Sequence, residues 1–164
     1  MRAVGNAQRP RREGGLVPQL DRIRELSAPE HGLAVAITSR ASGSPRASVV
    51  NAGVLDHPVT GEPVVAFVSR GTARKLSDIR ARPEVTVVFR SGWQWVAVEG
   101  RAELAGPDDR LGELGKDETT RLLRATYAAA VGGSADDWAA IDESMAAERQ
   151  TAVLLRIVRV YPPP

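Results

Sequence analysis

Cysteine is absent from this sequence of 164 residues, and histidine occurs only as His31 and His57. The lack of thiols excludes disulfide bonds, thiolate-bound metals and cysteine nucleophiles. Two imidazoles are too few for a multi-histidine centre, so we expect no metal site. Aromatic residues make up only 4% of the chain, so those that occur close together are informative.

Long apolar runs and an excess of charge of one sign are missing as well. The longest apolar runs, such as Leu33–Ile37, are far shorter than the roughly 20 residues that a membrane-spanning helix needs. No apolar stretch follows the arginines of residues 1–12, which excludes a secretory signal. The 22 basic and 20 acidic residues nearly balance, which does not indicate nucleic-acid binding. We therefore expect a cytoplasmic protein with no membrane or nucleic-acid partner.

The length and composition predict one globular domain after a polar tail. Residues 1–15 contain four arginines and almost nothing apolar, which is typical of a disordered basic tail. Such a tail can contact phosphates, or it can be a solvated terminus. With 43% apolar residues overall, the chain can build one core, and we assign residues 16–164 to a single domain.

Strand patterns dominate the domain. The apolar spacing and the turn residues predict six strands, at 33–38, 47–55, 64–69, 85–90, 93–104 and 152–160. Helices are expected at 18–28, 73–82, 107–130 and 134–149, the last with Ser134 as its N-cap. Because helices do not alternate regularly with strands, a doubly wound parallel sheet is disfavoured. A mainly β antiparallel barrel with flanking helices, of the α+β class, fits better.

The familiar catalytic motifs are missing. The sequence contains no nucleophile elbow, zinc-protease motif, phosphate-binding P-loop or dinucleotide fingerprint. His31 and His57 fall in predicted loops, where we expect exposed side chains without a role. The acidic pairs at 108–109 and 136–137 precede or begin predicted helices, where the helix dipole favours them, and we do not interpret them as catalytic dyads.

One turn has the composition of an anion-binding site. Ser69–Lys75 follows a predicted strand, Gly71 permits a sharp turn, and Thr72 can cap the next helix. Arg74 and Lys75 then fall in the first helical turn, where the dipole disfavours exposed cations by about 0.3–1 kcal/mol each. A bound phosphate or carboxylate would remove this conflict, because cations, hydroxyls and free N–H groups would converge on it. The alternative is a basic surface turn without a ligand.

Two of the three tryptophans stand close together. In the predicted strand Trp93 and Trp95 point to the same side, two residues apart. Two indoles on one face either pack in a core or form a platform for a flat aromatic ligand. Together with the basic turn, they suggest a cofactor with a planar ring and a phosphorylated tail.

The order of the motifs carries a family resemblance. The chain resembles the pyridoxamine 5′-phosphate oxidase-like split-barrel superfamily over residues 32–161, and more narrowly its actinobacterial members that use the deazaflavin coenzyme F420. The matching segments are Gly43–Arg46, Ser48–Asn51, Val65–Leu76, Ile79–Phe89, Trp93–Ala102, Trp138, Met145–Arg149 and Arg159–Tyr161. The resemblance implies a six-stranded antiparallel split β-barrel of the FMN-binding type, which forms a homodimer with a cofactor site at each end of the interface.

The resemblance also implies which residues bind the cofactor. The basic turn would hold the phosphate and the acidic tail, the second strand would lie along the ring system, and the aromatic strand would approach the pocket. The cofactor-binding residues are then Ser48, Val49, Val50, Ser69, Arg70, Gly71, Thr72, Arg74, Lys75 and Trp95.

The function that this resemblance implies is an F420-dependent oxidoreductase. Reduced deazaflavin would give a hydride to a small electron-poor acceptor, such as an enone, a quinone-like ring or a linear tetrapyrrole. The cofactor supplies the difficult chemistry, so no nucleophile or metal is needed. The proton donor stays open between water, an ordered solvent chain and His57. The alternatives are an FMN enzyme of the pyridoxamine phosphate oxidase type and a non-catalytic cofactor or haem binder, in which His31 or His57 would be the axial ligand.

Overall fold

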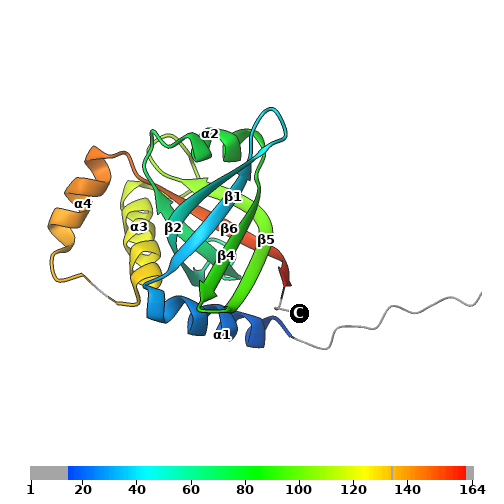
Figure 1. The fold of residues 1–164 in the computed structure, drawn as a ribbon. Coiled ribbons are helices and arrows are strands. Elements are labelled where there is room, and N and C mark those ends of the chain that lie inside the picture. The colour runs from blue at the N-terminus through cyan, green and yellow to red at the C-terminus, as the bar shows by residue number, and fades with distance from the viewer. Residues whose placement is uncertain (1–14, 134, 162–164) are drawn as a thin grey trace, which may run out of the picture.

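Six antiparallel strands close into a barrel in the computed structural model, which describes residues 15–133 and 135–161. The strand order around the barrel is β1-β2-β3-β6-β5-β4, which Figure 1 shows with β1, β2 and β4 toward the viewer. This arrangement confirms the predicted mainly β fold. The strands are β1 Leu33–Ser39, β2 Pro45–Asp56, β3 Pro63–Ser69, β4 Glu84–Ser91, β5 Gln94–Ala105 and β6 Thr151–Tyr161.

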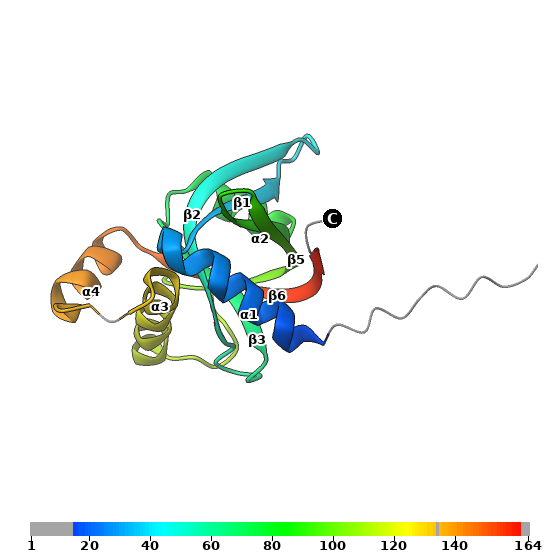
Figure 2. The same ribbon diagram turned by 60° about the horizontal axis from the view of Figure 1, so that its bottom comes forward.

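Two helices close the ends of the barrel. Helix α1, Leu16–Ser27, lies across one end, and helix α2, Arg74–Ala81, lies across the other (Figures 1 and 2). Both helices turn an apolar stripe inward, and the interior of the barrel consists of these side chains and the alternate inward residues of the strands. The largest fully buried members of this core include Ile23, Phe67, Leu76, Ile79, Val87 and Phe89.

The other two helices lie outside the barrel. Helix α3, Lys116–Val131, covers the outward side chains of β3 and β6, which form a second apolar cluster with it. It also packs closely on β2, since a Cβ added at Gly53 would lie 2.2 Å from the carbonyl oxygen of Ala129. Helix α4, Trp138–Ala147, lies beyond α3 (Figure 1) and buries only Met145 fully. A short 3₁₀ turn, Ala28–Glu30, precedes β1.

Helix α3 starts later than the sequence pattern predicts. The prediction of a helix over 107–130 is wrong for its first nine positions, because these residues form turns and an isolated bridge between Gly106 and Asp109. Gly112 adopts a φ of +54°, which a right-handed helix does not contain. The helix begins instead after Gly115, whose N–H donates to the Glu118 carboxylate at 2.6 Å.

The start of α4 and the tip of the β4–β5 hairpin also differ from the prediction. Helix α4 begins at Trp138 with Asp137 as its N-cap, whereas the predicted cap Ser134 lies outside the described residues. The predicted tail 1–15 falls outside them as well, apart from Gly15. In the hairpin, Gly92 and Trp93 form the turn, so Trp93 is fully exposed rather than part of the strand or the core. Among the described residues, no helix is both long enough and apolar enough to cross a membrane.

Candidate functional site

Strands β2 and β3 pair over only part of their length. Strand β2 pairs with β1 over Pro45–Asn51, but with β3 only from Ala52 onward. The end of β3, Val68 and Ser69, pairs with β6 on its other side and not with β2. Over this stretch no described strand pairs with the β3-facing edge of β2. Its backbone N–H and C=O groups are therefore open to another partner. We call this edge together with residues 68–70 the seam.

The predicted residues of β2 point to both sides of the strand. Val50 is buried in the barrel interior, and Ser48 points to the same side, with a buried hydroxyl oxygen. Val49 points outward and is 65% exposed. Because successive side chains of a strand point to opposite faces, Ser48 and Val50 face the core and Val49 faces outward.

Buried hydroxyls without partners gather around the seam. Ser69 ends β3 with 5% of its surface exposed, and the fully buried Thr151 lies opposite it on β6. Among the described residues, three buried side-chain polar atoms have no hydrogen-bond partner. They are the hydroxyl oxygens of Ser48, Ser69 and Thr151. Buried polar groups are normally satisfied, so three such groups on β2, β3 and β6 indicate a place where a polar ligand or water binds.

The turn after β3 is shaped by its contact with the end of α4. The N–H of Gly71 donates to the carbonyl oxygen of Glu148 at 3.1 Å, and the Arg70 guanidinium lies 3.2 Å from the Glu148 carboxylate. A Cβ at Gly71 would lie 2.7 Å from the carbonyl oxygen of Arg149. Glycine is needed here because another segment of backbone approaches closely, not because the turn has a positive φ.

Helix α2 begins with two cations, as predicted. Arg74 and Lys75 occupy its first turn, which contains no acidic residue. The N-cap is Ala73, and no side chain caps the helix, so the expectation that Thr72 caps it is wrong. Arg74 is exposed, whereas Lys75 is half-buried, and this burial lowers the pKa of Lys75. No ion pair to Arg74 or Lys75 occurs within the described parts of the chain.

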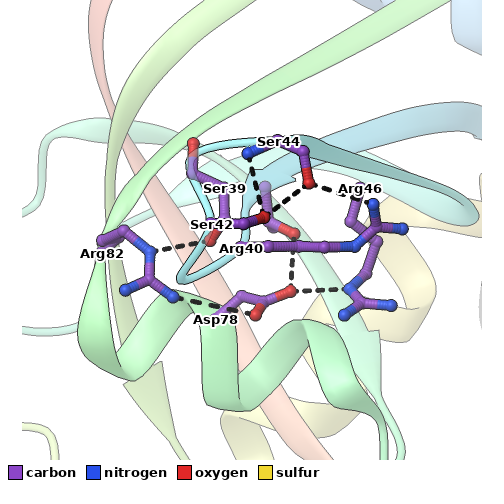
Figure 3. A network of polar contacts seen from close by, with 8 residues as sticks. Ser39, Arg40, Ser42, Ser44, Arg46, Asp78 and Arg82 are labelled. Atoms are coloured by element: carbon purple, nitrogen blue, oxygen red, sulfur yellow. Dashed lines mark hydrogen bonds and ion pairs between the residues drawn. The ribbon is translucent and has the colours of Figure 1, made fainter.

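A polar network fixes α2 over the barrel (Figure 3). The Arg46 guanidinium of β2 donates to the Asp78 carboxylate of α2 at 2.6 Å, and the Thr38 hydroxyl of β1 donates to the same oxygen at 3.5 Å. Arg82 lies 3.9 Å from the other oxygen of Asp78 and donates to the carbonyl of Ser39 at 2.9 Å. The hydrogen bond from Arg46 holds the pKa of Asp78 below its usual value. Sequence reasoning missed this anchor, which sets the position of the basic turn relative to β2.

Trp95 does not join the basic turn within one chain. It lies next to the β4–β5 hairpin, opposite Arg90, with its half-buried side chain on the outer face of the barrel. This hairpin lies at the end that α1 closes, whereas the basic turn lies at the end that α2 closes (Figure 1). The chain therefore brings Ser48, Val50 and Ser69–Lys75 toward one end of the barrel and leaves Trp95 at the other.

His57 is buried, contrary to the predicted exposed loop position. Only 3% of its surface is exposed, and its Nδ1 accepts the backbone N–H groups of Val59 and Thr60, each at 3.2 Å. Its Nε2 lies 3.0 Å from the Glu103 carboxylate. These partners assign the proton of the neutral imidazole to Nε2 and hold the loop to the barrel. His31 is exposed, as predicted.

Two cavities lie beside α4. The smaller, of about 280 Å³, is lined by Asn51 and Val68 of the seam and by Tyr127 and Ile141 of the helices. The larger, of about 800 Å³, lies between α3, α4 and the loop that precedes α3. Met145 and Gln150 line both cavities. No group of three or more potential metal ligands occurs in residues 15–133 and 135–161.

Comparison with known proteins supports the same architecture. The sequence profile of the pyridoxamine 5′-phosphate oxidase family matches residues 20–162. The chain belongs to this family. No curated protein matches this chain.

Solved structures share the fold of this oxidase-family chain at low sequence identity. The conserved hypothetical protein Rv2991 from Mycobacterium tuberculosis has a TM-score of 0.65 and 16% identity, over 93% of this chain and 88% of that chain. A structure named F420 reductase has a TM-score of 0.54 and 16% identity, over 83% of this chain and 92% of that chain. A haem-binding protein from Mycobacterium smegmatis has a TM-score of 0.56 and 19% identity, over 94% of this chain and 54% of that chain.

Proposed function

We propose that this protein is an F420-dependent oxidoreductase, which transfers a hydride between reduced deazaflavin and an electron-poor acceptor. The observation that carries the proposal is the pair of cations at the start of α2, next to the buried, unpartnered hydroxyl of Ser69. This arrangement lowers the stability of the ligand-free protein, and a bound anion would remove the unfavourable interactions. A phosphate on a planar redox cofactor supplies such an anion.

The residues around the seam fit this cofactor. Arg70, Arg74 and Lys75 would bind the phosphate and the acidic tail, and the Ser69 hydroxyl would donate to a phosphate oxygen. The free edge of β2 at Ser48–Val50 would lie along the ring and exchange hydrogen bonds with its polar atoms. When bound, the deazaflavin supplies the hydride, so the chain needs to bind, orient and shield it rather than react itself.

We assign the proton to water rather than to His57. Both ring nitrogens of His57 have partners, and the side chain is buried against Glu103. A group held in this way does not reach a substrate without losing three contacts. The same geometry argues against His57 as a haem ligand, which leaves exposed His31 for a haem-binding function.

FMN is the second candidate cofactor. The cations at the turn provide for the compact phosphate of FMN as well as for the longer acidic tail of F420. The family profile and a similar structure named as a pyridoxamine 5′-phosphate oxidase are consistent with this alternative, and the structure named F420 reductase with the first.

We also propose that two copies of the chain form a homodimer through the uncovered outer face of the barrel. Val49, Val35, Val88 and Ala97 form a continuous outward row across four strands, β2, β1, β4 and β5. Helix α3 instead covers the outward side chains of β3 and β6. Trp95 precedes Ala97 by two residues on β5, so it lies on the same face as the row. Apolar patches of this kind mark protein interfaces. In a dimer, Val49 and Trp95 would lie at the boundary between the copies, where a cofactor site at each end of the interface can use both chains.

Separate titrations with F420 and FMN test the proposed function. In the proposed dimer, Trp95 of one copy should report a ring bound at the seam of the other through its fluorescence. A Trp93→Phe variant removes the signal of the exposed indole. Selective binding of F420 that weakens with added salt is the expected result. Binding of FMN alone would assign the protein to the FMN branch, and binding of neither would refute the proposal. Sedimentation velocity of the same samples tests the dimer.

A further inference from the structure

The carboxylate of Glu148 lies between the basic turn and the cavities beside α4. Its Oε1 is 3.2 Å from the Nε of Arg70, and its Oε2 accepts a hydrogen bond from the Gln150 amide at 2.6 Å. Arg70 belongs to the turn that would bind the cofactor phosphate, whereas Gln150 lines both cavities. One side chain therefore connects two parts of the candidate site that lie on different elements.

The main chain around Glu148 is held on both sides. Glu148 is the C-cap of α4, and its carbonyl oxygen accepts the N–H of Gly71 at 3.1 Å. The N–H of Gln150 donates to the carbonyl oxygen of Met145 at 2.9 Å. Because these bonds fix the backbone, a change of partner at the Glu148 carboxylate acts on the side chains of Arg70 and Gln150.

The two contacts of this carboxylate differ in strength. The Arg70 side chain is 71% exposed, and exposed ion pairs contribute little to stability. The hydrogen bond from Gln150 is short, has an ionised acceptor and is partly buried, so it is the stronger of the two. Arg70 is therefore the partner that Glu148 can lose to a competing anion.

A phosphate at the start of α2 would be such a competitor. It offers several acceptor oxygens, and Arg74 and Lys75 would attract it to the same turn. Arg70 would gain a charge-assisted hydrogen bond to the phosphate in exchange for a weak ion pair. Glu148 would keep Gln150 as its partner, and that hydrogen bond would strengthen because the carboxylate is no longer shared with Arg70.

We infer that Glu148 binds Arg70 in the ligand-free protein and releases it to a phosphate group at the basic turn. The inference rests on the anion site of the proposed function. Glu148 thereby lowers the affinity of the turn for anions, since the ligand must displace it. It also makes the side chain of Gln150, in the wall of both cavities, respond to whether the turn is occupied. Glu148 is thus a positioning residue that couples the turn to the cavities.

Titration of the ligand-free protein with inorganic phosphate at constant ionic strength, followed by NMR of the nitrogen-labelled chain, tests this exchange. The backbone amide signals of Arg74 and Lys75 give the Kd. In the wild type, the side-chain amide signal of Gln150 should shift with the same Kd. In Arg70→Ala that signal should stay in place even at saturating phosphate, because Glu148 then has no partner to exchange.

The Kd of two variants measures the competition itself. Glu148→Gln should lower the Kd for phosphate about two- to fivefold, the size expected for an exposed ion pair. Combined with Arg70→Ala, the same substitution should no longer change the Kd. Glu143→Gln is the matched control, because it removes the same charge from an exposed position of α4 and should leave the Kd unchanged.

An unchanged or higher Kd in Glu148→Gln, an equal fall in Glu143→Gln, or a wild-type Gln150 signal that does not respond to phosphate would overturn the inference. Phosphate that binds neither the wild type nor Glu148→Gln would refute the anion site and this inference with it. If phosphate behaves as expected but F420 does not bind, the proposed function fails and the role of Glu148 stands. If F420 binds and the Gln150 signal does not respond, only the role of Glu148 fails.

Discussion

Replacing Lys75 by methionine is expected to stabilise the free protein. The substitution keeps an apolar chain of similar length at this half-buried position and removes a positive charge from the first turn of α2. Relief from the helix dipole is worth about 0.3–1 kcal/mol. For a domain of this size, roughly 2–4 °C per kcal/mol gives a rise in Tm of about 1–4 °C. Thermal unfolding without ligand, followed by circular dichroism, measures it.

The same substitution is expected to weaken anion binding. Loss of one charge-assisted hydrogen bond costs about 1.5–3 kcal/mol. Since about 1.4 kcal/mol corresponds to a factor of ten, the Kd for F420 should rise about 10- to 150-fold. Calorimetric titration with F420 measures the change. If Lys75 binds the ligand, its removal should raise the Tm of the free protein and weaken the binding of F420. If Lys75 is purely structural, its removal should lower the Tm.

Lys116 provides the matched control, because it is the other lysine of the chain and begins α3. Lys116→Met should give a small stabilisation of the same origin and leave the Kd for F420 unchanged. An unchanged Kd in Lys75→Met, or a Kd that rises equally in both variants, would refute the assignment of the anion site to the start of α2.

The pH dependence of the Lys75→Met variant gives an independent check. Burial lowers the pKa of Lys75 below its ordinary value, so the folded chain releases this proton more easily than the unfolded chain. Between the two pKa values the unfolded state binds more protons, and the contribution of Lys75 to wild-type stability improves as the pH rises. The stability advantage of Lys75→Met should therefore shrink as the pH rises through this window.

Three further changes test the fold and the assembly. The pKa of Asp78 is lower in the folded chain than in the unfolded chain, so its ionised carboxylate stabilises the fold above about pH 4, and this stabilisation is lost as the pH falls. Asp78→Asn should therefore destabilise the protein near neutral pH and make its stability depend less on pH in acid. Urea unfolding at several pH values measures both effects. Gly53→Ala should cost about 1–3 kcal/mol or more by the same method, whereas Gly133→Ala, with no atom near its Cβ, should not. Val35→Lys should dissociate the proposed dimer in sedimentation velocity, and a wild-type protein that already sediments as a monomer would refute that interface.

Local patterns were sufficient to predict the strands and the basic turn. Each strand alternates or runs apolar between turn residues, and the conflict of Arg74 and Lys75 with the helix dipole is visible within one turn of sequence. The late start of α3 was missed because Leu111 and Leu114 continue a helical spacing, while Gly112 prevents a helix there. A positive φ at a single glycine outweighs such a pattern.

Features that depend on strand register could not be predicted. The seam arises because β2 exchanges β1 for β3 at Asn51 and Ala52, and no local pattern encodes that exchange. The pairing of Arg46 with Asp78 joins residues 32 positions apart, so it requires the fold itself. The sequence likewise contains no signal that the loop after His57 would fold back onto the ring and bury it.

The position of β6 between β3 and β5 has a consequence for how the protein folds. Short connections join the strands of three pairs, β1–β2, β2–β3 and β4–β5, so these strands can pair as soon as they are synthesised. Strand β3 can pair with β6 only after α3 and α4 have been synthesised, because β6 follows them in the chain. Such distant pairings close slowly, because the intervening chain must be ordered first. Ser69 and Thr151 become neighbours only at this step. A ligand that binds at the seam would therefore bind only chains in which β6 has paired with β3. A cofactor present during synthesis would stabilise this late pairing rather than the early hairpins.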